Sequence, residues 1–267
     1  AQQQRVDGGW AADKESAVAP TGLALLAFLG AGYVDRGDHA YVATVRNGLK
    51  YLLAQQDQAG RIGSDGVKEH AIGALALTEA YWMTRNPRYK QPAQQAVAWL
   101  EAARTPGEAW TDIQTTGWSV MAWKSAKFGG LAVDPAIQAE VGKWLDARTD
   151  VKTGIVDSSP RATAIGILTR IFLGADPRKE PVVRSAADYC LTRLPDLKAV
   201  DRLYWFFGTL GMFQIGGTHW KQWNQTMKEA IVKAQDEKGS WQPVGQLSET
   251  YGRVGETSLM TMCLEVY

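Results

Sequence analysis

A lone aspartate, Asp112, is the residue of this sequence best placed for acid chemistry. It directly precedes a run of small and apolar residues that begins at Ile113. A carboxylate at such a position caps the helix that follows, because it accepts hydrogen bonds from the unpaired N–H groups of the first turn. A carboxyl group whose neighbours raised its acidity could instead donate a proton to a substrate. The sequence favours the cap and leaves the acid as an alternative.

Polar residues also begin or flank the other apolar segments, so they could share one site with Asp112. If these segments are parallel helices, their N-terminal ends meet at one mouth, toward which the helix dipoles and free N–H groups point. Arginines at this mouth could pair with acids and close it, or they could frame a pocket with apolar walls. The candidate pocket residues are Glu69, His70, Thr116, Trp118, Arg161, Thr163, Asp201, Tyr204, Trp205, Arg253 and Glu256.

Other reactions require a pair of catalytic residues or a characteristic loop, which can be looked for in the sequence. Glycoside hydrolysis requires two facing carboxyl groups about 5–9.5 Å apart, and Asp112 and Glu256 could converge across the same mouth. The sequence contains no glycine-rich phosphate loop and no serine nucleophile elbow. Cys190 and Cys263 lie within apolar helical patterns, so we expect buried free thiols. No cofactor is predicted.

The overall charge and hydropathy exclude several classes of partner. Lys and Arg total 29 against 28 for Asp and Glu, a formal net charge of +1. This balance predicts no electrostatic surface for nucleic acid or for an anionic membrane. The sequence has no uninterrupted apolar run long enough to span a bilayer. We expect a soluble protein; its compartment is not predicted, and export is compatible with removal of a signal segment before Ala1.

A repeated turn provides the scaffold for these residues. Its pattern is a glutamine, three residues, a glycine, one residue and a bulky apolar residue. The full copies are Gln4–Trp10, Gln56–Ile62 and Gln235–Trp241. Weaker copies end at Trp110, with Arg104 in the place of the glutamine, and at Val156. The period is roughly 47 residues, which is typical of a repeat built from a pair of helices.

Each turn leads into a small-residue-rich apolar helix, and an amphipathic helix follows. The first kind is apolar on nearly every side, which predicts burial on every side. These helices lie around residues 21–25, 70–74, 116–120, 163–167, 203–215 and 257–261. The amphipathic helices are expected at about 40–56, 90–103, 136–148, 181–193 and 219–235.

The alternation of buried and half-buried helices predicts an all-α fold, an α/α toroid with six inner and five to six outer helices. A linear solenoid is the competing arrangement, but it would leave one face of the apolar helices in water. On this interpretation residues 1–267 form a single toroid domain. One outer helix is missing from the expected order, so we expect this domain to be tethered to further sequence in a longer chain.

The turn pattern resembles the QW-type repeat of squalene–hopene and oxidosqualene cyclases. In two copies an aromatic–leucine pair precedes it, Trp99-Leu100 and Trp144-Leu145. The likeness is strongest to bacterial proteins with prenyltransferase/squalene-oxidase repeats, on the evidence of segments 118–127 and 252–257. It covers essentially the whole chain. It implies the toroid of the terpenoid cyclase and protein prenyltransferase superfamily, and a bacterial source, but no single activity, because function depends on the site.

Each chemistry of that superfamily requires particular residues. Polyene cyclases protonate their substrate from an aspartate usually held in an Asp-x-Asp-Asp cluster, which this sequence lacks. Protein prenyltransferases bind zinc through Asp, Cys and His; Asp188 and Cys190 have a similar spacing but lie on an expected outer helix, so no metal site is predicted. The thioester of complement-type macroglobulins needs a cysteine shortly before a glutamine, and neither cysteine has one.

We therefore expect a binding or interaction domain, whose partner is an apolar, isoprenoid-like small molecule or another protein. Whether the protein is an enzyme stays open. One alternative is a cyclase- or transferase-type enzyme on an isoprenoid substrate with Asp112 as its acid. The other is a carbohydrate-active toroid with paired carboxylates. The eleven tryptophans are explained largely by turn and packing positions, which weakens them as evidence for a ligand.

Overall fold

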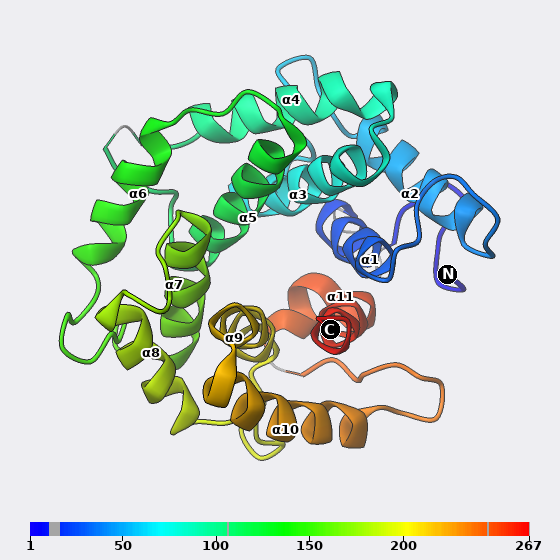
Figure 1. Cartoon of the computed structure of the whole chain (residues 1–267). Helices are drawn as coiled ribbons and strands as arrows, with labels where there is room; N and C mark the ends of the chain where they lie inside the picture. The colour runs from blue at the N-terminus through cyan, green and yellow to red at the C-terminus, as the bar shows by residue number, and fades with distance from the viewer. Residues whose placement is uncertain (11–16, 106, 245, 267) are drawn as a thin grey trace.

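The computed structural model describes residues 1–10, 17–105, 107–244 and 246–266, with the backbone alone at 246–250. Across these residues it contains eleven α-helices and no β-strand (Figure 1). The helices are α1 (Val18–Gly30), α2 (Val42–Ala54), α3 (Val67–Thr84), α4 (Pro87–Ala102), α5 (Ile113–Gly129), α6 (Ala136–Asp146), α7 (Pro160–Phe172), α8 (Pro181–Leu191), α9 (Arg202–Ile215), α10 (Gly217–Ala234) and α11 (Gln246–Leu264). Every expected helix is present.

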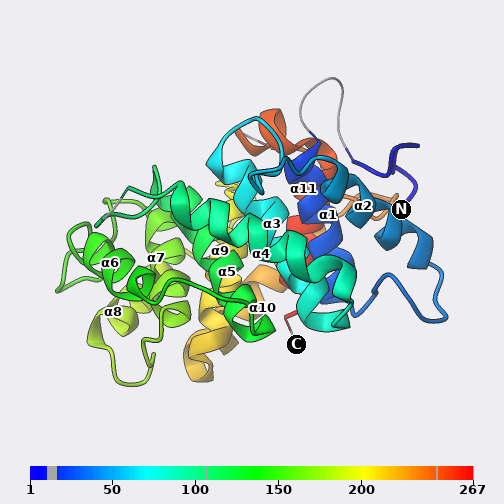
Figure 2. The same ribbon diagram turned by 90° about the horizontal axis from the view of Figure 1, so that it is seen from above.

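The helices form two concentric layers. The odd-numbered helices stand around a common axis, and the even-numbered helices lie outside them (Figure 1; seen from the side in Figure 2). α1 packs against α3 on one side and α11 on the other, so the inner layer closes into a ring. This confirms the predicted toroid, with six inner and five outer helices in the described part of the chain. It also excludes the linear solenoid.

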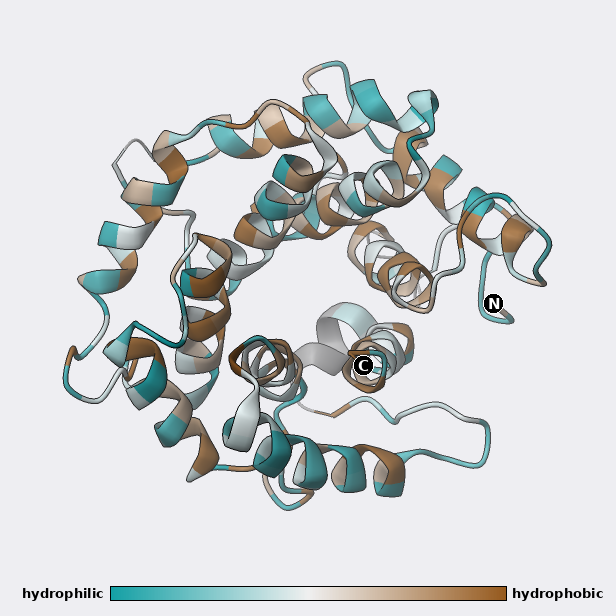
Figure 3. Ribbon diagram, in the orientation of Figure 1, coloured by the Kyte–Doolittle hydropathy of each residue, from teal (hydrophilic) through white to brown (hydrophobic). Residues whose placement is uncertain are grey.

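Burial follows the sequence pattern of each layer. The outer helix α6 buries a single stripe, formed by Ile137, Val141 and Leu145, which are spaced by about one helical turn. The inner helix α3 is buried at every position from Glu69 to Thr78. Figure 3 shows the same contrast, with outer helices that are hydrophilic on the side away from the ring. None of the described helices has the length and apolar content to cross a bilayer.

The glutamine of the repeated turn fastens the turn to the next outer helix. The side-chain amide of Gln56 donates to the carbonyl oxygens of Gly60, at 3.0 Å, and Pro92, at 2.9 Å. The amide of Gln4 makes the equivalent pair of bonds in the first turn. One bond therefore closes the turn, and the other joins it to α4 or α2.

The glycine of the turn lies directly against the same outer helix. A Cβ atom added to Gly60 would lie 2.4 Å from the carbonyl oxygen of Gln95, and one added to Gly8 would lie 2.3 Å from that of Asn47. The φ angles of the two glycines are +94° and +91°, a region that glycine adopts without steric cost. Both the backbone conformation and the close approach therefore require glycine.

Arg104 takes over the task of the glutamine in the third turn. Its guanidinium donates to the carbonyl oxygen of Glu108, at 2.8 Å, and reaches the next outer helix by pairing with Glu140. The bulky residues of the turns are all buried: Trp10, Ile62, Trp110, Val156 and Trp241. The tryptophans at these positions pack the core, as the sequence predicts.

The sixth outer position, beside α11, holds no helix in the described residues. Correspondingly, Gln235 donates to Gly239 of its own turn, at 3.1 Å, and no bond from it to an outer helix is present in the described chain. A Cβ atom added to Gly239 would meet nothing closer than 3.9 Å. That a longer parent chain supplies a helix here remains a prediction.

The substitutions Gly60→Ala and Gly239→Ala should separate the two requirements for glycine. Each places a Cβ atom on backbone with positive φ, which costs about 1–2 kcal/mol. Only at Gly60 does that atom overlap a carbonyl oxygen, so we expect this variant to lose about 1–3 kcal/mol more free energy of unfolding in urea. Equal losses in the two variants would contradict the role given to the contact with α4.

Candidate functional site

Asp112 is the N-terminal cap of α5. Its Oδ1 accepts the backbone N–H groups of Gln114, at 2.8 Å, and Thr115, at 2.9 Å, and its Oδ2 accepts the Thr115 hydroxyl at 2.7 Å. Partial burial acts to raise the pKa of this carboxyl, but the hydrogen bonds from Thr115 and Gln114 outweigh it and lower the pKa. The carboxylate is therefore held ionised, which is the opposite of what a proton donor requires.

Two other candidates, His70 and Thr163, fasten the repeated turns to the inner helices. The backbone N–H of Ile62 donates to His70 Nδ1 at 2.9 Å, and that of Val156 donates to Thr163 Oγ1 at 3.0 Å. Because Nδ1 accepts, the ring proton is on Nε2, which lies 2.9 Å from the carbonyl oxygen of Ala96. Burial lowers the pKa of His70 to about 4, so the ring is neutral and both nitrogens are in use.

A buried ion pair joins the start of α9 to the neighbouring inner helix α11. Arg202 Nε lies 3.2 Å from Glu256 Oε2, and the two side chains are only 4% and 0% exposed. Burial raises the pKa of Glu256 to about 6, although Arg202 partly offsets the rise. Tyr251 of α11 is also buried, and the acids Glu69 and Asp112 add to the effect of burial in raising its pKa. The sequence did not single out Arg202, and neither of the two arginines predicted at this end is the ion-pair partner of Glu256.

The two arginines predicted at this end, Arg161 and Arg253, pair with other acids. Arg253 Nη1 lies 3.3 Å from an oxygen of Asp236, and Arg161 Nε lies 2.8 Å from one of Asp201. Arg161, Asp201, Tyr204 and Trp205 together line a polar side pocket of about 590 Å³ between the starts of α7 and α9 and the loop after α8. The structure thus brings four of the candidates together, but away from the axis.

The remaining candidates are buried. Glu69 Oε2 accepts the backbone N–H of Asp65 at 2.9 Å. Thr116 and Trp118 are fully buried on α5, and the Trp118 ring stacks on that of Phe206 at 5.3 Å between centroids. Because α9 lies two places from α5 around the ring, this stack crosses the barrel and fills its middle.

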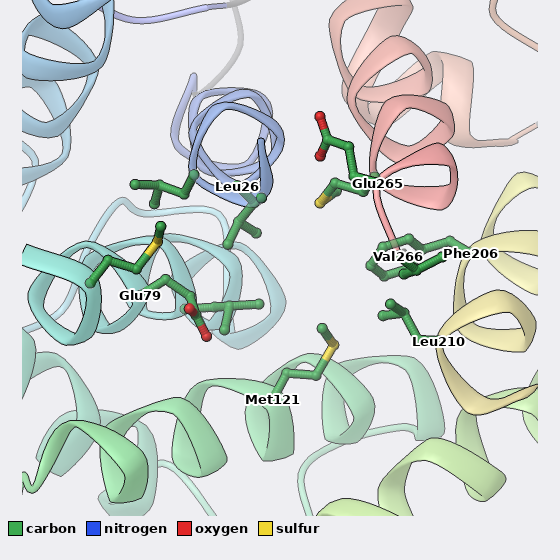
Figure 4. Close-up of a pocket in the computed structure, with 12 residues that line it drawn as sticks. Leu26, Glu79, Met121, Phe206, Leu210, Glu265 and Val266 are labelled. Carbon is green, nitrogen blue, oxygen red and sulfur yellow. The ribbon is translucent and has the colours of Figure 1, made fainter. Parts of the chain in front are cut away.

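The axis opens on the other side of Phe206. A cavity of about 220 Å³ lies among α1, α3, α5, α9 and the C-terminal end of α11 (Figure 4). Leu, Met, Phe and Val side chains make up most of its wall, and Glu79 and Glu265 are its acidic members. The lining residues are Leu26, Leu29, Gly30, Leu75, Glu79, Met83, Met121, Phe206, Leu210, Met262, Glu265 and Val266. For comparison, an apolar protein cavity of about 150 Å³ admits benzene.

The two carboxyl groups reach the cavity from different helices. Glu79 comes from α3 and Glu265 directly follows α11 (Figure 4). Burial raises the pKa of Glu265 to about 7 and also raises that of Glu79, which Ser125 partly offsets. Glu265 Oε2 is buried without a hydrogen-bond partner in the described chain. Inner helices end here, and their carbonyl dipoles disfavour negative charge. The environment therefore favours neutral carboxyl groups, which can donate a hydrogen bond.

None of the pocket residues predicted from the sequence lines this cavity, because the prediction followed the polar residues where the inner helices begin. One signal for the other end was present. Between residues 71 and 80, Glu79 is the single charged residue, and Thr78 is the one other polar residue. The helix that carries them is expected to be buried on every side. Glu265 carries no such signal, because it follows the last helix.

The residues with zinc-like spacing are engaged in other contacts. Asp188 Oδ1 lies 2.9 Å from His219 Nε2 on the outside of the toroid. Cys190 is a buried free thiol, as is Cys263, and burial raises the pKa of both to about 12. Among the described residues, no cluster of three His, Cys, Asp or Glu side chains could hold a metal ion.

No protein-family model matches the sequence, and a search of curated proteins finds no match. Solved structures with the same fold do exist. The chain is similar to the α-1,6-mannanase GH76A from Salegentibacter sp. HEL1_6, with a TM-score of 0.72 and 12% identity over 99% of this chain and 95% of that chain. An inactive variant of that mannanase in complex with α-1,6-mannotetrose matches with a TM-score of 0.68 and 12% identity over 98% and 95%.

The type II terpene cyclase MstE from Scytonema is also similar, with a TM-score of 0.64 and 12% identity over 99% of this chain and 94% of that chain. Toroids of one fold therefore include a glycoside hydrolase and a terpene cyclase. At this identity the likeness shows the fold alone, so function depends on the residues of the site.

The raised pKa of Glu265 predicts a pH-dependent stability. The folded pKa of about 7 exceeds the ordinary value of 4.5, so the folded chain binds the proton more tightly, and the associated stability is lost as pH rises from about 4.5 through about 7. We expect Glu265→Gln to remove this loss. The variant should then be more stable than the parent at pH 8 by about 1 kcal/mol, allowing for solvent screening of a half-buried group. Parallel stability curves against pH would contradict the assignment.

Proposed function

We propose that this toroid is a binding domain that takes the apolar part of an elongated, isoprenoid-like ligand into the central cavity. The observation that carries the proposal is the wall of the cavity, where Leu, Met, Phe and Val residues surround an opening at the end of the barrel axis. Burial of apolar ligand surface against such a wall contributes about 25 cal/mol per Å². The fold that this chain shares with a terpene cyclase supports the same choice.

The two carboxyl groups specify the polar part of the ligand. At neutral pH Glu265 is close to half protonated, because its pKa is about 7. A protonated carboxyl donates a hydrogen bond, and the helix C-termini around it disfavour an anionic ligand group. A neutral oxygen, such as the hydroxyl of an isoprenoid alcohol, meets both conditions. The relationship to QW-type repeat proteins belongs to the same proposal, and the Gln4 and Gln56 turns support it.

The alternatives have less support. Asp112 is an ionised helix cap, which argues against it as the acid of a cyclase. For carbohydrate, the apolar cavity would leave hydroxyl groups without partners, at a cost of about 1–3 kcal/mol each. The inactive mannanase variant lacks two consecutive aspartates, and the present sequence contains no such pair. A carbohydrate ligand would therefore have to use the polar side pocket that contains Arg161 and Asp201.

Binding of farnesol, an isoprenoid alcohol, tests the proposal. We expect native mass spectrometry to detect one farnesol per chain and titration calorimetry to give a binding signal that α-1,6-mannotetrose does not. Leu210→Trp fills part of the cavity and should weaken farnesol binding at least about tenfold, equivalent to about 1.4 kcal/mol. Leu197→Trp, on an exposed loop, is the matched control. Equal affinity of both variants for farnesol would exclude the cavity as the site.

A further inference from the structure

Positive charge is concentrated at one sector of the toroid, although the chain as a whole is nearly neutral. The segments 80–100 and 113–133 contain no Asp or Glu. They include the end of α3, the start of α4 and the end of α5. These lie together because α4 begins directly after α3 ends, and α5 packs against α3 in the inner layer. Their cations are Arg85, Arg88, Lys90, Lys124 and Lys127. None of these five forms an ion pair with any described residue.

Exposed apolar side chains lie among these cations. Trp82 is 41% exposed, Met83 39% and Phe128 60%. The Trp82 and Phe128 rings are 6.3 Å apart between centroids, which joins the ends of α3 and α5 into one surface. Arg85 reinforces the junction, since its guanidinium donates to the carbonyl oxygen of Gly129. Large exposed aromatic rings at one place on a protein surface mark an interaction site.

The cations stand over the faces of these rings. The guanidinium of Arg85 lies 4.7 Å from the centroid of Trp82, and the ammonium of Lys124 lies 4.7 Å from that of Phe128. A carbohydrate ligand would stack its sugar ring on an open aromatic face. In this surface, one face of the Trp82 ring and one face of the Phe128 ring are covered by the cations. What the surface offers is ring edges surrounded by ammonium and guanidinium groups. Burial and the neighbouring Lys127 lower the pKa of Lys124, as expected where no acid compensates the charge.

We propose that this surface, the cationic rim formed by Trp82, Met83, Arg85, Lys124, Lys127 and Phe128, docks the toroid on an anionic lipid bilayer. Aromatic rings partition into the headgroup region of a bilayer, and each Lys or Arg beside an anionic leaflet contributes about 1 kcal/mol, or about fivefold in affinity. Lipid phosphates supply the counter-charges that the described chain does not. The near-neutral net charge, which by itself predicts no such surface, conceals this segregation.

The cationic rim is continuous with the central cavity. Met83 belongs to the rim and also lines the cavity. Across the ring, Phe213 at the end of α9 is a further exposed aromatic residue at the same end of the barrel. A docked toroid would face the bilayer with its open end, so an apolar ligand could pass between them. This last step rests on the proposed function, whereas docking itself does not.

Co-sedimentation with lipid vesicles tests the proposal. The full chain should bind vesicles of mixed phosphatidylcholine and phosphatidylglycerol, bind pure phosphatidylcholine vesicles much more weakly, and be released by high salt. The double variant Lys124→Glu/Lys127→Glu should weaken binding to the anionic vesicles at least about twentyfold. The matched control Lys228→Glu/Lys233→Glu, on the exposed face of α10, changes net charge equally and should bind like the parent.

Other outcomes overturn the proposal. Equal loss in both double variants would show a response to net charge alone, and equal binding to neutral and anionic vesicles would remove the role of the cations. If vesicles are not bound but the chain dimerises and Phe128→Ser abolishes the dimer, the rim is a self-contact instead. Farnesol binding by a chain that ignores all vesicles would leave the proposed function standing and the docking surface refuted.

Discussion

The close contact between a turn glycine and the next outer helix is the constraint on which this toroid depends. At Gly60 the backbone approaches the carbonyl oxygen of Gln95 so closely that no Cβ atom fits between them, and Gln56 locks the same contact with a bond to Pro92. The turn can therefore lie in only one way between an outer helix and the inner helix that it begins. The same close contact recurs at Gly8 against α2 and at Gly154 against α8, so three turns set their inner helices parallel in the same way.

Parallel inner helices give the ring two chemically different ends. Where the helices begin, free N–H groups attract acids and hydroxyl groups, so this end is rich in caps such as Asp112 and in side chains that hold the turns, such as His70. The buried Arg202–Glu256 pair joins α9 to α11 at this end. Where the helices end, their carbonyl dipoles disfavour ionised carboxyl groups within the cavity that contains Glu79 and Glu265. A polar end that is closed and an apolar end that is open follow from one arrangement.

The sequence predicts the scaffold well because the scaffold is local and repeated. The periodicity locates all eleven helices. It also identifies Arg104 at the glutamine position of the third turn, where the structure shows that Arg104 makes the corresponding hydrogen bond. The sequence cannot show which end of the axis is open. That depends on contacts between distant segments, such as the stack of Trp118 on Phe206, and on the partner that Glu256 finds among several arginines. A net charge likewise cannot show that cations and acids lie on different surfaces.

The most direct test of this account is a crystal structure of the protein under xenon pressure. Xenon enters apolar cavities that are large enough and lack polar partners, so it reports where the barrel axis is open. The account predicts a xenon site among Leu75, Met121 and Phe206 and none between Trp118 and the Arg202–Glu256 pair. Xenon at the N-terminal end of the axis, or an axis without xenon, would contradict it.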